Sequence, residues 1–287
     1  MKNSKVFIST GYYKNINPIE TLDYFIKKKI YDIEFSGGLH MTQKDEKKFF
    51  NKLSKHNARL HNYFPPPKIK FVINLASKNK NILRKSINHV KKSIILSKKI
   101  NANYFSFHAG FRIDPEVKSL GRKFKKIKLV KKEVSENIFL KSIKEISNFA
   151  LRHKVKILIE NNVINKKNLI LFNGNPLLLT HPIDIIKFFK KTPKNVGFLL
   201  DVGHLKVSAK TENFNLINSL KKLNKIVTGY HLSDNDFIED RNLSFSKRSW
   251  FIKFLKKRLN YYTIEVYDKN INKVRGIKNF LEKILNK

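Results

Sequence analysis

An aspartate and a histidine follow a short apolar segment in the second half of the chain. The segment spans residues 196–200, and Asp201-Val202-Gly203-His204 comes directly after it. Five consecutive apolar residues predict a strand that is buried on both faces of a parallel sheet. Folds with such sheets bind ligands at the carboxyl ends of their strands. The pair is therefore either a set of metal ligands, with Gly203 allowing a sharp turn between them, or part of an ordinary surface loop.

Further acidic and imidazole side chains fall at the ends of other predicted strands. They are His61, His108, Glu160, then His231 with Asp234 and Asp236, and finally Glu265. Glu160 and Glu265 lie in apolar segments without an adjacent Lys or Arg. A charge in a parallel barrel strand is costly unless it is paired or bound to a metal. The simplest arrangement is convergence on one cation, and the best four-ligand set is Glu160, Asp201, His231 and Glu265.

Three carboxylates and one imidazole suit a single divalent metal, Mn²⁺, Mg²⁺, Co²⁺ or Zn²⁺. An octahedral ion held by four side chains keeps two positions open, which a hydroxy-ketone would fill. The metal would polarise the carbonyl and stabilise an enediolate. Glu160 and Glu265 are the predicted acid/base pair, moving a proton at the carbon next to the carbonyl. This chemistry is isomerisation or epimerisation of a sugar or sugar phosphate.

Strands and helices alternate along the whole chain. The predicted strands are 5–12, 30–36, 58–64, 104–108, 155–160, 196–201, 226–232 and 261–267. The predicted helices are 19–29, 42–56, 78–100, 133–153, one beginning at Pro182, 216–223, 245–259 and 271–285. Eight such units in 287 residues predict a single-domain (β/α)8 TIM barrel covering residues 1–287. A doubly wound sheet would need a Gly-rich phosphate turn after the first strand, which the sequence around Gly11 does not provide.

Two long connections separate predicted elements, residues 109–132 and 161–180. Connections of this length in a compact domain usually form an active-site lid or a binding loop. Arg112 in the first of them, and Lys206 beyond the sixth strand, are candidates for binding a substrate phosphate or carboxylate. The alternative is that both are ordinary solvated side chains.

The composition limits the classes of protein that remain. The chain has no cysteine, which excludes disulfides, thiolate metal sites and cysteine nucleophiles. No apolar run approaches the roughly 20 residues that span a bilayer, and the N-terminal segment predicts no signal peptide, so we expect a cytoplasmic protein without a membrane partner. The net charge of +38 comes mainly from Lys spread along the helices, and Arg is scarce. We interpret it chiefly as compositional drift, with a nucleic-acid partner as the alternative.

Five segments carry a resemblance to a known family: Phe107-His108-Ala109-Gly110, Ile159-Glu160-Asn161-Asn162, Asp201-Val202-Gly203-His204, His231-Leu232-Ser233-Asp234-Asn235-Asp236 and Thr263-Ile264-Glu265-Val266-Tyr267. With these, the chain resembles the xylose isomerase-like barrel superfamily, which includes sugar isomerases and epimerases and AP endonuclease family 2. The resemblance implies that Glu160, Asp201, His231 and Glu265 hold the metal, and that His204 contacts substrate. We place His61, His108, Arg112 and Lys206 around the same substrate, and members of this superfamily often form homo-oligomers.

The resemblance also leaves two alternatives open. In the zinc-dependent DNA-repair members, residues matching His61, His108 and His204 are metal ligands. Asp240, and with it Asp234, is then a candidate for additional metal binding, but Asn242 stands where that pattern has a histidine. An AP endonuclease acting on abasic DNA is therefore the second hypothesis. The third is a degenerate barrel that binds a sugar without turning it over.

Overall fold

The computed structural model describes residues 4–119 and 124–287. Its eight strands are β1 (Val6–Ser9), β2 (Asp32–Phe35), β3 (Asn57–His61), β4 (Tyr104–His108), β5 (Lys156–Glu160), β6 (Val196–Asp201), β7 (Val227–Leu232) and β8 (Tyr262–Ile264). Neighbouring strands pair in parallel, and β8 pairs with β1. The strands therefore close into a barrel, as the sequence predicts.

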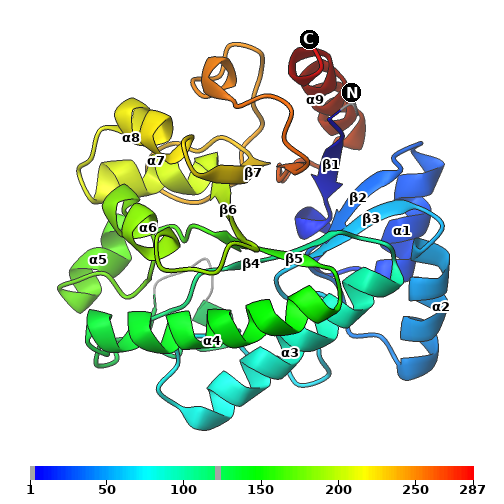
Figure 1. The fold of residues 1–287 in the computed structure, drawn as a ribbon. Coiled ribbons are helices and arrows are strands. Elements are labelled where there is room, and N and C mark those ends of the chain that lie inside the picture. The colour runs from blue at the N-terminus through cyan, green and yellow to red at the C-terminus, as the bar shows by residue number, and fades with distance from the viewer. Residues whose placement is uncertain (1–3, 120–123) are drawn as a thin grey trace.

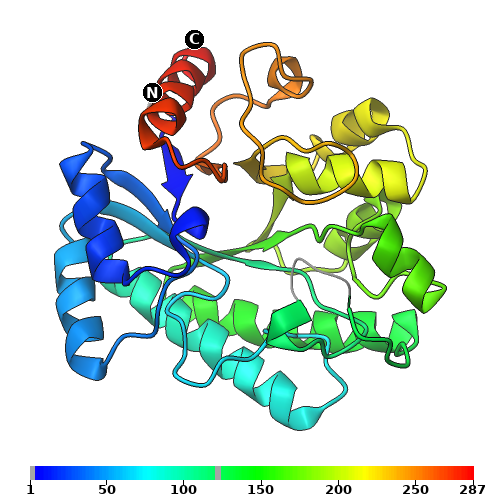
Figure 2. The ribbon, with the colours of Figure 1, turned by 180° about the vertical axis from the view of Figure 1, so that it is seen from behind.

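The described residues form nine α-helices, which lie outside the barrel (Figures 1 and 2). They are α1 (Pro18–Lys27), α2 (Gln43–Leu53), α3 (Lys80–Lys99), α4 (Lys132–Arg152), α5 (Lys166–Phe172), α6 (Pro182–Phe189), α7 (Val202–Thr211), α8 (Leu216–Leu223) and α9 (Ile271–Leu285). The start of α1 explains why Asn17-Pro18 predicted the beginning of a helix. The Asn17 side chain accepts a hydrogen bond from the Ile19 N–H, and Pro18 is the first residue of the helix. The two ends of the described chain meet, with the Ser4 amide 2.7 Å from Asn286 Oδ1.

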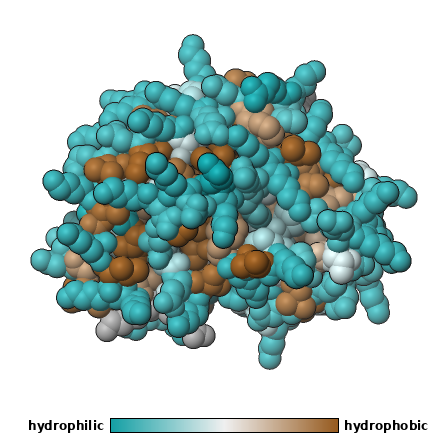
Figure 3. Space-filling model, turned by 90° about the horizontal axis from the view of Figure 1, so that it is seen from below, coloured by the Kyte–Doolittle hydropathy of each residue, from teal (hydrophilic) through white to brown (hydrophobic). Residues whose placement is uncertain are grey.

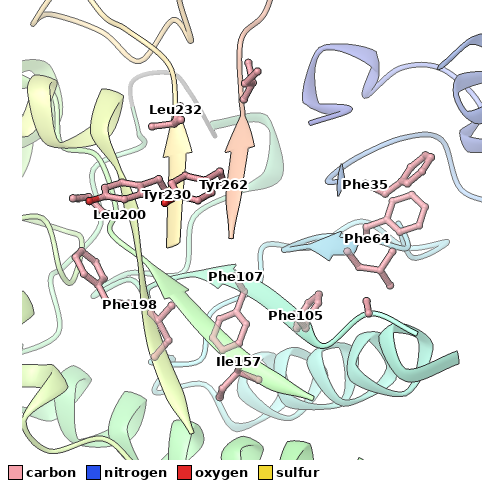
Figure 4. Close-up of a cluster of buried hydrophobic side chains, with 14 of the residues drawn as sticks. Phe35, Phe64, Phe105, Phe107, Ile157, Phe198, Leu200, Tyr230, Leu232 and Tyr262 are labelled. Atoms are coloured by element: carbon pink, nitrogen blue, oxygen red, sulfur yellow. The ribbon is translucent and has the colours of Figure 1, made fainter. Parts of the chain in front are cut away.

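Alternation along each strand separates two kinds of side chain. Along each strand, every second side chain faces the helices and joins the main apolar core, to which Phe105, Phe107, Ile157, Phe198 and Tyr230 belong (Figure 4). The side chains between them face the barrel interior, where Leu158, Leu199 and Tyr261 form a small separate cluster. The polar residues at the strand ends are among these inward-facing positions, so their side chains all point to the same interior.

Helical spacing was misleading at residues 245–259, where we predicted a helix. The structure has turns there and only a short 3-10 helix, Ile252–Phe254. Side chains of other elements form hydrogen bonds with backbone N–H and C=O groups that would bond to each other in a helix. The Lys256 amide donates to the Tyr230 hydroxyl, and Asn224 Nδ2 donates to the Phe254 carbonyl. These contacts hold the segment in a non-helical path.

Two helices were missed in predicted connections. Residues 161–180 contain α5, whose end at Asn173 has a left-handed backbone (φ 47°). The segment after β6 is α7 rather than a sharp turn at Gly203. The described part of the predicted connection 109–132 contains a short 3-10 helix, Val117–Ser119, and α4 begins at its last residue, while residues 120–123 lie outside the described part. The connections after β4 and β5 pack on each other through a second apolar cluster: Ile113, Phe124, Ile164, Phe172 and Leu177.

The surface seen from below is mainly hydrophilic, with hydrophobic patches between the polar side chains (Figure 3). In the described part of the chain, no helix is both long and apolar enough to cross a membrane. The polar cover agrees with the many Lys residues on the helix surfaces.

His89 on α3 makes the stability of the barrel dependent on acid. Its ring is buried and stacks on Tyr63, with centroids 5.6 Å apart. Burial, assisted by Lys92, lowers its pKa from 6.5 to about 4. Since the folded state disfavours the protonated ring, this contribution to stability is complete above pH 6.5 and is lost as the pH falls through 4. We expect a loss of roughly 3 kcal/mol from this residue.

The variant His89→Phe keeps an aromatic ring against Tyr63 and removes the titrating group. Urea unfolding at pH 7 and pH 4 should show a smaller acid loss in His89→Phe than in the wild type. His153→Phe, at a half-buried position directly after α4, is the matched control. An equal acid loss in His89→Phe and in the wild type would contradict the assignment.

Candidate active site

The four predicted metal ligands come together at the carboxyl ends of the strands. Glu160 ends β5, Asp201 ends β6, His231 lies one residue before the end of β7, and Glu265 directly follows β8. All four are buried, and one ligand atom from each lies within 4.8 Å of the others. The predicted set is therefore a compact group at one end of the barrel.

Glu160 stands at the centre of a ring of histidines. Its Oε1 lies 3.3 Å from His204 Nδ1 and 3.6 Å from His108 Nδ1. Its Oε2 lies 3.3 Å from His231 Nδ1 and 3.4 Å from His61 Nε2. Four of the predicted histidines thus surround one fully buried carboxylate.

The charges in this group shift the pKa values of Glu160 and His231 strongly. Burial alone would raise the pKa of Glu160, but His108, His231 and His61 outweigh it and hold that pKa well below the ordinary value. Burial would lower the pKa of His231, yet Glu34 and Glu160 hold it well above 6.5. Glu160 is therefore an anion at neutral pH and can accept a proton.

Asp201 links the site to α7. Its Oδ1 accepts the His204 N–H at 2.7 Å and so caps the helix, while its own N–H donates to Asn161 Oδ1 at 2.9 Å. The other carboxylate oxygen, Oδ2, is buried without a hydrogen-bond partner. Burial raises the pKa of Asp201 to about 7, and the nearby anions Glu160 and Glu265 add to the shift.

Several atoms in the group lack the partners that buried polar atoms normally have. Both oxygens of Glu160, Asp201 Oδ2 and both ring nitrogens of His231 are buried without a hydrogen bond of good geometry. They are oxygen and imidazole donors gathered in one small space. This donor set fits one divalent cation of the Mn²⁺, Mg²⁺, Co²⁺ or Zn²⁺ type.

Glu34, a fully buried carboxylate on β2, belongs to the site although we did not predict it from the sequence. Its Oε1 lies 2.8 Å from His231 Nε2, and its Oε2 accepts hydrogen bonds from the Tyr261 and Thr263 hydroxyls. His231 holds the pKa of Glu34 at about 2, although burial would raise it. Like Glu160, Glu34 is a carboxylate in an apolar strand, so the signal that indicated Glu160 could have found it.

Glu34 orients the His231 ring, whose other nitrogen lies 2.9 Å from Glu265. Partners of this kind typically strengthen metal affinity 10- to 100-fold. We therefore expect Glu34→Gln to lower the affinity for Mn²⁺ or Co²⁺ by about tenfold or more. Titration calorimetry on metal-free protein measures this, with Glu46→Gln on the surface of α2 as the control. An unchanged affinity in Glu34→Gln would contradict the orienting role.

Two predicted substrate-binding cations are engaged within the protein. Arg112 donates from Nε to the Val130 carbonyl at 2.9 Å and from Nη1 to the Asn175 carbonyl at 2.7 Å. Lys206 lies 2.6 Å from Asp234 Oδ1 and over the ring of Phe237. Arg112 therefore ties two connections together, and Lys206 neutralises Asp234.

The remaining predicted residues form the edge of the site. His61, His108 and Glu160 make a second group with ligand atoms within 4.8 Å of one another. His204 Nε2 lies 3.3 Å from Asp240 Oδ2. Asn242 is buried and its Oδ1 has no hydrogen-bond partner. Asp234 and Asp240 belong to neither of these groups of possible metal ligands.

The Tyr267 hydroxyl is a further group near the site that the sequence did not single out. Although 37% of the residue is exposed, desolvation of the hydroxyl raises its pKa well above 10, and the charges of Glu265 and Asp240 add to this effect. A neutral hydroxyl here can donate a hydrogen bond. Tyr267 appeared only as the end of the last quoted motif, and nothing in its spacing indicated a role.

A closed barrel of eight parallel strands with helices outside it is a TIM barrel, and this one gathers acidic and imidazole groups at the carboxyl ends of its strands. The model of the family described as xylose isomerase-like TIM barrel matches residues 31–280, and the chain belongs to this family. No protein of curated function matches the sequence.

Solved structures with the same fold cover nearly the whole chain at low sequence identity. A D-tagatose 3-epimerase-like protein is 17% identical, with a TM-score of 0.70 and 98% of each chain covered. D-psicose 3-epimerase with D-tagatose from Clostridium cellulolyticum H10 is 14% identical (TM-score 0.61, 98% of this chain and 96% of that chain). A protein from Thermus thermophilus soaked with ZnCl₂ is also 14% identical (TM-score 0.60, 99% and 98%). These likenesses establish the fold.

Proposed function

We propose that this protein is a divalent-metal-dependent sugar isomerase or epimerase. The observation that carries the proposal is the convergence of Glu160, Asp201, His231 and Glu265, with unpartnered donor atoms, at the end of the barrel. The fold neighbours, which are named a D-tagatose 3-epimerase-like protein and a D-psicose 3-epimerase, support the same class of substrate. The metal would be one ion of Mn, Mg, Co or Zn.

Glu160 and Glu265 are the proposed acid/base pair. Both carboxylates face His231 Nδ1, at 3.3 and 2.9 Å, so they border the same small space. The ionised Glu160 would take a proton from the carbon next to the substrate carbonyl, and Glu265 would return one to it. A bound divalent cation would supply polarisation of the carbonyl. His204 and Tyr267 would donate hydrogen bonds to sugar hydroxyls.

The engagement of Arg112 and Lys206 favours an uncharged sugar over a sugar phosphate. Arg112 is bonded to backbone carbonyls and Lys206 to Asp234. A phosphate bound by either cation would have to break one of these contacts. The proposed substrates are therefore free ketoses of five or six carbons. We propose that the protein binds these small molecules in the cytoplasm.

Proton exchange with the solvent tests the proposal directly. Protein loaded with Mn²⁺ or Co²⁺ is incubated in heavy water with a panel of ketopentoses and ketohexoses. Proton NMR should show deuterium uptake next to the carbonyl of at least one sugar, together with its epimer or isomer. Binding of a sugar without exchange would support the degenerate barrel instead.

A second candidate function rests on the group formed by His61, His108 and Glu160. This group could hold a further zinc, as in the AP endonuclease hypothesis, and His204 with Asp240 could contribute. Asn242 opposes it, because an amide oxygen is a poor zinc ligand. Cleavage of an abasic-site duplex by zinc-loaded protein would establish this function, and intact duplex with active sugar exchange would exclude it.

A further inference from the structure

A cavity of about 450 Å³ lies at the end of the barrel opposite the candidate active site. Its lining comes from the segments that lead into β1, β3, β4 and β8, with Ser4, Lys5, Asn57, Arg59, Asn103 and Asn260 among the residues. These are the amino-terminal ends of the strands. This volume lies in the range of pockets that bind small molecules.

Arg59 is the unusual member of this lining. Its side chain is only 5% exposed, and its Nη1 is buried without a hydrogen-bond partner. The guanidinium lies between two aromatic rings, 3.3 Å from the Phe7 centroid and 4.0 Å from the Tyr261 centroid. Cation–π contact stabilises the charge but does not satisfy the Nη1 donor.

Burial lowers the pKa of Arg59 and outweighs the attraction of the carboxylates Glu34 and Asp32, whose oxygens contact other groups. Glu34 faces His231 with Oε1 and accepts two hydroxyl hydrogen bonds with Oε2. Asp32 pairs with Lys278 at 2.9 Å and accepts from Asn57. Among the described residues, no carboxylate oxygen forms an ion pair with the Arg59 guanidinium. A buried guanidinium with a free N–H donor and no paired carboxylate can bind an anion.

The rest of the cavity has the character of an anion site. None of its lining side chains is acidic, and Lys5 adds a positive charge. Asn101, Asn103 and Asn260 offer side-chain amides around the opening, whereas the Asn57 amide donates to Asp32. Arg binds phosphate in a bidentate manner, and a nearby Lys adds a point charge.

We propose that this cavity binds a phosphate group, either as inorganic phosphate or as a small phosphate monoester. Arg59 is the buried anchor and Lys5 the cation at the opening. The site is separate from the candidate metal group, which lies at the carboxyl-terminal ends of the strands. It does not depend on the proposed function, because its residues lie at the other end of the barrel.

The test is calorimetric titration of inorganic phosphate into metal-free, full-length protein. We expect saturable binding of about one phosphate per chain, weakened at least about tenfold in Lys5→Glu and in Asn103→Asp. Lys210→Glu, at an exposed position on α7, is the control and should bind within about twofold of the wild type. Absence of saturable binding to the wild type, or equal binding in Lys5→Glu and Lys210→Glu, would overturn the proposal.

Arg59→Met should abolish binding. Circular dichroism first establishes that this variant folds, and if it does not, the Lys5 and Asn103 variants decide the outcome because both positions are at the surface. Asp201→Asn should bind phosphate like the wild type, since it alters only the metal group. A changed phosphate affinity in Asp201→Asn, above all an increase on removal of this negative charge, would place the anion at the metal group and would overturn the proposal.

Comparing the affinities of inorganic phosphate, ribose 5-phosphate and ribose identifies which phosphate compound the cavity binds. Ribose 5-phosphate binding more tightly than inorganic phosphate would identify a monoester as the ligand. Equal affinities would identify free phosphate. Ribose that binds as tightly as its phosphate would show that the cavity does not recognise the anion, and would overturn the proposal.

Discussion

Replacing Glu265 by Gln is expected to reduce deuterium uptake into the sugar by about 10³-fold. The amide keeps the shape of the side chain and an oxygen toward His231, but it can no longer give or take the proton. Glu265 follows β8 with its amide bonded to the Leu232 carbonyl at 3.0 Å, so its backbone is held by the barrel. The folded state should therefore persist, which circular dichroism and thermal unfolding would check.

The control for this variant is Glu145→Gln on α4. Glu145 is exposed and pairs with Lys91 at the surface, away from the strand ends. Its exchange rate should equal that of the wild type. If Glu265→Gln retained full exchange with the same metal content as the wild type, the acid/base assignment would be wrong.

The second large effect is expected for Asp201→Asn in metal binding. The amide oxygen can still accept the His204 N–H, so the start of α7 keeps its cap. The variant loses the carboxylate whose Oδ2 is free to bind a cation. We expect the affinity for Mn²⁺ or Co²⁺ to fall at least about 100-fold, as measured by calorimetry on metal-free protein.

The same variant should change how stability depends on pH. The pKa of Asp201 is raised to about 7, against an ordinary value of 3.8. Its contribution to metal-free stability is therefore complete below pH 3.8 and is lost as the pH rises through 7. Asp201→Asn lacks this loss, so it should be more stable than metal-free wild type at about pH 8, by a few kcal/mol. A variant that is less stable at that pH would show that the buried charge is already compensated.

The barrel and the convergence of four donor side chains could be predicted, because the alternation within strands agrees with the alternation of strands and helices along the chain; that the four side chains bind a metal stays a prediction. Alternation along the strands and their parallel order place Glu160, Asp201, His231 and Glu265 on the inner face at one end. Each of these residues is also a polar residue in an otherwise apolar segment, and this pattern indicated a candidate site residue. The family match over residues 31–280 confirms the fold that this pattern predicted.

The misses have physical causes that act over long distances in the sequence. Glu34 carries the same local signal as Glu160, but its contact with Tyr261, 227 residues away, has no local pattern and could not be predicted. The segment 245–259 has helical spacing, but hydrogen bonds to Tyr230 and Asn224 hold it in another conformation. Arg112 stays a predicted substrate-binding residue, and its contacts within the protein could not be foreseen because its carbonyl partners lie in connections that only the fold brings together.

The metal content of the protein is the most direct test of the central claim, that Glu160, Asp201, His231 and Glu265 hold one divalent ion. The protein is purified without chelators and its metals are counted by elemental mass spectrometry. We predict about one Mn, Co, Mg or Zn per chain, and loss of that metal in Asp201→Asn. No metal in the wild type, even after soaking with each of these ions, would contradict the claim.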